Sequence, residues 1–148
     1  MSTFLKINKY QLKALSLLYF GVLLYLTFFM PRRYEVIDFR ALLNLKLFDK
    51  LNGDSLHSMR FESEVNLVVD MVGNILLFVP FPLALCIVMG KELAPIWVLI
   101  VVLAATSSIE ILQYLFNRGV ADIDDVFLNF VGGATGLVLV HRIYKSRL

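Results

Sequence analysis

Residues 93–115 read LAPIWVLIVVLAATSSIEILQYL, and Glu110 is the one charged residue among them. A helix that crosses a lipid bilayer needs about 20 mostly apolar residues, so this stretch is long enough and apolar enough to span a membrane. Three further stretches meet the same criterion, at about residues 14–30, 65–89 and 125–144. The sequence therefore predicts an all-α integral membrane protein, a four-helix transmembrane bundle.

The composition of the whole chain supports a membrane protein. Hydrophobic residues make up 59% of the 148 residues, whereas a soluble domain has about 45 to 50%. The net charge is only +2 and long uncharged runs separate the charges, which excludes a nucleic-acid binder with a basic face. With one cysteine and two widely separated histidines, we expect no metal site and no cofactor.

The chain is predicted to form one domain, residues 1–148, whose second span contains Pro80 and Pro82. Two prolines this close remove backbone donors, so we expect the helix to kink or break there. The segment of about 31–64 is the longer loop, between the first two spans. The other joints are short, which makes spans two to four antiparallel.

Two interpretations stay open for residues 36–51 of the longer loop. Apolar residues alternate with charged ones there, which fits an amphipathic helix that lies on the membrane surface. Leu43, Leu45 and Leu47 also alternate as they would in a strand.

The terminal segments indicate the orientation. Cations crowd into both of them, whereas those of the longer loop are mixed with acids. Lysine and arginine favour the cytoplasmic side, and the first helix usually dominates insertion. We therefore expect both termini in the cytoplasm.

If the four spans cross the membrane in alternating directions, a zigzag, the polar residues of several spans lie in one leaflet, whichever way the chain is oriented. The first and third spans end, and the second and fourth begin, on the same side of the membrane. The residues gathered there are Arg32, Arg33, Asp70, Asn74, Glu110, Gln113, Arg118, Asp122, Asp124, Asp125 and Asn129. Because unpaired charge within a bilayer costs free energy, the acids should pair with other groups or line a wet cavity.

Helical spacing predicts which of these polar residues share one face of their helix. Residues three or four apart share one face of a helix. Three sets of polar residues have that spacing: Asp70 with Asn74, Ser107 with Glu110 and Gln113, and Asp125 with Asn129. The same face of the fourth span continues through Gly132 or Gly133 to Gly136, which lets another backbone approach closely, and we expect this packing within the chain.

A purely structural role also fits these residues. Arg118 could form an ion pair with one of the acids and close the bundle, while the amides join helices through hydrogen bonds. Asp124 is expected to be a solvated loop acid.

Three segments read in order resemble one known family. They are NILLFVPFP at 74–82, SSIEILQYLFNRG at 107–119 and ADIDDVFLNFVGGATG at 121–136. Together they are similar to the VanZ-like family of small bacterial membrane proteins, which is named for a teicoplanin-resistance factor. This chain departs from the family pattern at Pro82 and at residues 32–39.

The resemblance implies a multi-pass protein of the bacterial cytoplasmic membrane that is linked to glycopeptide susceptibility or envelope biology. It also implies functional interest in Asn74, Phe78, Pro80, Glu110, Gln113, Arg118, Asp125, Asn129 and Gly132. With Asp122 from the leaflet argument, we predict a binding site of Asn74, Glu110, Gln113, Arg118, Asp122, Asp125 and Asn129.

Three active functions compete with a ligand-free scaffold. The first is recognition, at the outer leaflet, of a polar lipid headgroup, a lipid-linked cell-wall precursor or a lipoglycopeptide, with Arg118 holding phosphate or carboxylate. The second is an intramembrane enzyme in which Glu110 and Asp125 are the candidate catalytic acid and base. The third is a small transporter, which would require oligomerisation. We favour the first, with membrane lipids as partners and no nucleic acid.

Overall fold

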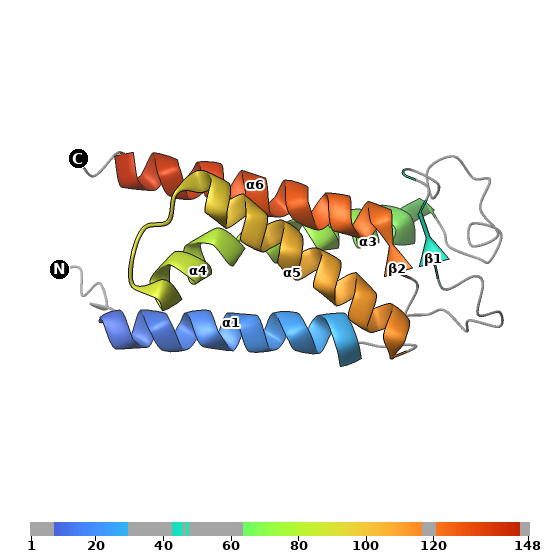
Figure 1. Ribbon diagram of the computed structural model, residues 1–148, viewed down its shortest axis with the longest axis horizontal. Coiled ribbons are helices and arrows are strands. Elements are labelled where there is room, and N and C mark those ends of the chain that lie inside the picture. The colour runs from blue at the N-terminus through green and yellow to red at the C-terminus, as the bar shows by residue number, and fades with distance from the viewer. Residues whose placement is uncertain (1–7, 30–42, 46, 48–63, 117–120, 146–148) are drawn as a thin grey trace.

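The computed structural model describes residues 8–29, 43–45, 47, 64–116 and 121–145. The elements in chain order are α1 (Lys9–Phe29), β1 (Leu43–Asn44), α3 (Glu64–Phe78), α4 (Phe81–Met89), α5 (Pro95–Leu115), β2 (Ala121–Asp122) and α6 (Ile123–Lys145), as Figure 1 shows. Four stretches are long and apolar enough to cross a membrane: Lys9–Phe29, Val68–Met89, Pro95–Leu115 and Ile123–Arg142. The all-α four-helix membrane bundle is therefore confirmed.

The first helix begins five residues before the apolar stretch that predicted it, and a hydrogen-bonded cap explains the difference. The side-chain oxygen of Asn8 accepts hydrogen bonds from the backbone N–H groups of Tyr10 and Gln11. In return, the backbone N–H of Asn8 donates to the Gln11 side chain. This reciprocal capping box satisfies donors that a helix start otherwise leaves free, and it is independent of hydropathy.

The second span is broken between α3 and α4, as the prolines predicted. Pro80 stands at the N-cap of α4, and Pro82 occupies one of its first positions, where a missing N–H costs no helical hydrogen bond. The hydroxyl of Tyr19 on α1 donates to the backbone carbonyl of Leu77, at 2.7 Å. A carbonyl at the break thus finds its partner on a neighbouring helix, which is what the membrane interior requires.

Helix α6 is the centre of the bundle, because it contacts α3, α4 and α5. Its glycines allow this: a Cβ atom on Gly132 would collide with the backbone carbonyl of Ile75, and one on Gly136 with that of Val79. The predicted close approach therefore occurs within the chain, against the last turn of α3 and the break that follows it.

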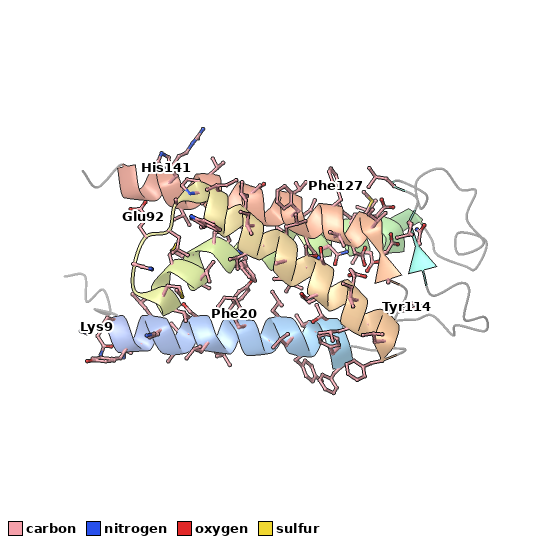
Figure 2. All side chains as sticks on the ribbon, in the orientation of Figure 1. Lys9, Phe20, Glu92, Tyr114, Phe127 and His141 are labelled. Atoms are coloured by element: carbon pink, nitrogen blue, oxygen red, sulfur yellow. The ribbon has the colours of Figure 1, made fainter. Side chains whose placement is uncertain are left out.

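The apolar core of the bundle is small. Its buried members are Leu23, Phe78, Phe81, Val98, Val102 and Ile109. Most other apolar side chains of the spanning helices are exposed, as expected where the surrounding solvent is lipid. Phe20 reaches from α1 toward α4 (Figure 2) and contacts Phe81 edge-on, with ring centroids 5.2 Å apart.

Figure 1 shows how the two ends of the bundle differ. The start of α1 and the end of α6 lie at one end. At the other end, α1 and α5 finish and α3 and α6 start, beside β1 and β2. This arrangement confirms the zigzag on which the one-leaflet prediction depends.

The short strands β1 and β2 form a parallel pair in which Leu43 is opposite Ala121 and Asn44 is opposite Asp122. At Leu43–Asn44 the strand interpretation is therefore correct, and the helical one is wrong. Most of residues 36–51 lies outside the described residues. The pair brings a part of the longer loop to the start of α6.

Candidate functional site

Eight buried polar side chains gather where α5 ends and α6 begins. We call them the polar cluster: Asn44, Thr106, Glu110, Gln113, Asp122, Asp124, Asp125 and Asn129, none more than 7% exposed. Acids in such surroundings are costly unless they are hydrogen-bonded or paired, so their contacts decide what they do.

Helix α5 contributes one polar stripe to the cluster. Thr106, Glu110 and Gln113 are its buried polar residues, and a spacing of four and then three places them along one face. The side-chain amide of Gln113 donates to the backbone carbonyl of Thr27, at 2.9 Å. This carbonyl lies in the last turn of α1, where no helical N–H can reach it, so Gln113 ties α1 to α5.

Asp122 organises the turn that leads into α6. Its Oδ1 accepts the backbone N–H of Asp124 at 2.9 Å, the usual bond of an N-cap residue. The same oxygen accepts the side-chain amide of Asn44, at 3.4 Å. The backbone N–H of Asp122 in turn donates to Oε2 of Glu110, at 3.0 Å. One chain of hydrogen bonds therefore joins β1, α5 and α6.

A second polar contact lies deeper in the bundle. The side-chain amide of Asn129 donates to the hydroxyl of Thr106, at 2.9 Å. Each of these residues is four positions from an acid on its own helix, Asp125 on α6 and Glu110 on α5, which is about one turn or 5.4 Å along the axis. The polar cluster therefore has two layers. The acid layer, near the helix ends, consists of Glu110, Asp122, Asp124 and Asp125. The Thr106–Asn129 layer lies below it.

Protein atoms close the bundle below the second layer. One turn beyond Asn129, a Cβ on Gly132 would meet the Ile75 backbone, and one on Gly133 would meet the side chain of Val102. Val102 and Phe78 are completely buried. The polar cluster thus has a packed apolar floor.

The structure brings together most of the predicted site. Glu110, Gln113, Asp122, Asp125 and Asn129 all belong to the polar cluster. Asn74 is only half-buried, and the side chain of Asp70, which the zigzag placed in the same group, is exposed. Arg118, Arg32 and Arg33 lie outside the residues that the structure describes.

The expectation for Asp124 is wrong. This carboxylate is 6% exposed and sits in the first turn of α6, not in a solvated loop. A helix start suits a carboxylate, because the free N–H groups there carry partial positive charge.

Two residues of the polar cluster escaped the sequence analysis. Thr106 is four residues before Glu110, a helical spacing that places the two on one face, whereas Ser107, which the sequence predicted on that face, is only half-buried. No local pattern in the sequence indicates Asn44, because it reaches Asp122 through a strand pair between distant parts of the chain.

Comparisons with known proteins agree with this architecture. The family model described as VanZ/LLP1 matches residues 16–144. Protein VanZ of Enterococcus faecium is 40% identical over 70 residues, which make up 47% of this chain and 43% of that protein. The aligned region thus spans less than half the length of this relative. No solved structure matches the chain.

Proposed function

The chain belongs to the VanZ/LLP1 family, and on that premise we propose that this multi-pass membrane protein binds the polar part of an amphiphilic envelope molecule in its polar cluster. The candidates are a lipid headgroup, a lipid-linked cell-wall precursor and a lipoglycopeptide at the outer leaflet of the bacterial cytoplasmic membrane. Binding there would alter susceptibility to glycopeptides such as teicoplanin, and the chain would keep both termini in the cytoplasm.

One observation carries the proposal: the buried polar groups are concentrated where the spanning helices end. Glu110, Asp122, Asp124 and Asp125 are all at most 6% exposed. That depth is where headgroups meet the hydrocarbon region. Carboxylate and amide oxygens accept hydrogen bonds from hydroxyl and amino groups, and such groups are what sugars and amine-bearing headgroups offer.

The packed floor favours binding over transport. Below the polar cluster, the glycines of α6 rest directly on the backbone of α3 and on Val102. A solute that entered from the cluster end would meet this core and not a continuous polar path. Transport would therefore require a pathway between chains.

The contact of Glu110 favours binding over acid–base catalysis. Its Oε2 accepts the N–H of Asp122, which engages the carboxylate in holding the start of α6. An enzyme with Glu110 and Asp125 as acid and base remains the alternative proposal. The variant Glu110→Gln tests this role, because an amide retains an acceptor oxygen for the N–H of Asp122 but cannot exchange protons at neutral pH. The phenotype should survive if Glu110 only holds the start of α6, and it should be lost if Glu110 is the catalytic acid or base.

The test measures teicoplanin susceptibility and protein stability on the same variants. In a susceptible host that expresses the protein, Asp125→Asn should abolish the change in minimal inhibitory concentration while membrane abundance and melting temperature stay near those of the wild type. The control is Glu92→Gln, which alters an exposed acid at the opposite end of the bundle and should keep the phenotype. If the loss of phenotype follows the loss of stability across the variants, the polar cluster is a structural clasp.

A further inference from the structure

Asn129 carries a polar atom that the fold leaves without a partner. The residue is 3% exposed, and its amide nitrogen is engaged with Thr106. Its side-chain oxygen has no hydrogen-bond partner among the residues that the structure describes. A buried acceptor in this condition costs free energy unless a donor reaches it.

The surroundings of Asn129 restrict the direction from which a donor can come. Toward the middle of the bundle, the next turn of α6 is pressed against Ile75 and Val102, and that space is filled by protein atoms. In the opposite direction lies the acid layer, one turn away, with Asp125 on the same face of α6. A donor that reaches Asn129 therefore passes the acid layer.

The chemistry of the two layers selects one kind of ligand. The oxygen of Asn129 can only accept, and the carboxylates above it are acceptors when ionised. Phosphate and carboxylate groups offer oxygens and do not complement this set. Hydroxyl and ammonium groups do, because a hydroxyl supplies an O–H donor and an ammonium group supplies three N–H donors.

We propose that the polar cluster selects amphiphiles whose headgroup carries hydroxyl or ammonium donors, and that one of these donors binds the side-chain oxygen of Asn129. This inference rests on the proposed function, since it names the class of molecule that the same site takes. Asn129 and the acid layer then bind different parts of one headgroup, at two depths.

The test uses the full chain in nanodiscs of phosphatidylcholine, whose headgroup has no N–H or O–H donor. Four probes are added separately: phosphatidylethanolamine, phosphatidylglycerol, a monoglucosyl diacylglycerol and a lipid-linked disaccharide precursor. Bound lipid is counted by native mass spectrometry. The wild type should retain at least one of the probes in preference to phosphatidylcholine, and retention of none overturns the inference.

Variants then locate the contact. Asn129→Leu should weaken retention of the preferred probe by roughly tenfold, the order expected for the loss of one buried hydrogen bond. Asn129→Asp keeps an acceptor and adds charge, so it should strengthen retention of an ammonium probe and leave a hydroxyl probe bound, which distinguishes the two sources of donors. Thr106→Val removes the hydroxyl that accepts from the side-chain amide of Asn129 and should therefore weaken retention. The control is Thr135→Val, at an exposed position of α6, which should have no effect.

The outcomes separate this inference from the proposed function. If Asp125→Asn changes retention but Asn129→Leu and Asn129→Asp do not, the polar cluster binds headgroups and the role of Asn129 is wrong. If none of these variants changes retention of any probe, the proposed function fails as well. Melting temperatures on the same samples show whether Asn129→Leu is folded. If it is not, Thr106→Val provides the decision, because the loss of its contact with Asn129 should weaken retention of either kind of probe.

Discussion

Tyr19 and Tyr25 lie on the same helix but in different surroundings, which makes them a matched pair at the scale of single residues. The Tyr19 hydroxyl donates to Leu77 at the helix break, whereas Tyr25 is 61% exposed and stacks on Phe29. Tyr19→Phe should lower the free energy of unfolding by about 0.6 kcal/mol, the average for a hydrogen bond between membrane helices. Tyr25→Phe keeps its ring contact and should change nothing. Reversible unfolding in mixed micelles measures both, and equal effects would show that the hydroxyl of Tyr19 does not support the break.

The glycines allow a second comparison. A methyl group on Gly136 would collide with the Val79 carbonyl and approach Pro82, whereas one on Gly73 has no neighbour within 4 Å. Gly136→Ala should therefore destabilise the protein by about 1 to 3 kcal/mol, the usual cost of overpacking. Gly73→Ala should be neutral or stabilising, since alanine favours a helix by roughly 0.8 to 1 kcal/mol. A fully stable Gly136→Ala protein would mean that α6 and the break can separate without cost.

At the scale of elements, the start of α6 depends on the side chain of Asp122. Asp122→Ala removes the cap oxygen that accepts from Asp124 and Asn44, and it should cost roughly 0.5 to 2 kcal/mol of unfolding free energy. Asp122→Asn retains an oxygen acceptor and caps a helix almost as well, so most of the stability should remain. Melting curves of the two purified variants, measured in the same detergent, test this. Equal losses would indicate that the charge of Asp122 matters and its cap does not.

Elements whose cause is local could be predicted from the sequence. The break near Pro80 follows from missing backbone donors, and the stripe on α5 follows from helical spacing. The starts of α1 and α6 were predicted less well, because Asn8 and Asp122 set them through caps and not through hydropathy. The position of Asn44 could not be predicted at all, since it depends on pairing across the whole bundle.

At the scale of the whole molecule, the start of α1, the end of α6 and the α4–α5 turn share one end of the bundle. Lys9, Glu92 and His141 lie at that end, and Tyr114 and Phe127 lie toward the other (Figure 2). Glu92→Cys and His141→Cys should therefore react with an impermeant thiol reagent from the same side of the membrane, which we expect to be the cytoplasm. Phe116→Cys, beyond the end of α5, should react from the opposite side. The wild-type chain, whose Cys86 is buried, is the control, and labelling of His141→Cys and Phe116→Cys from one side would contradict the four-span topology.

The contacts of α6 also bear on how the protein is made. This helix follows α1, α3, α4 and α5 in the chain, and it packs against α3, α4 and α5. A ribosome delivers it to the membrane after Glu110 has already been inserted, so the growing chain holds an acid in the bilayer before Asp122 and Asn129 arrive. Until then, Thr106 and Glu110 of the polar stripe of α5 lack the partners that α6 and its start supply, and they face water, lipid or the insertion machinery. Translational arrest before Ile123 would leave Thr106 without its partner on α6, so an unfinished chain would differ from a mature one by a polar group of α5 that α6 does not cover.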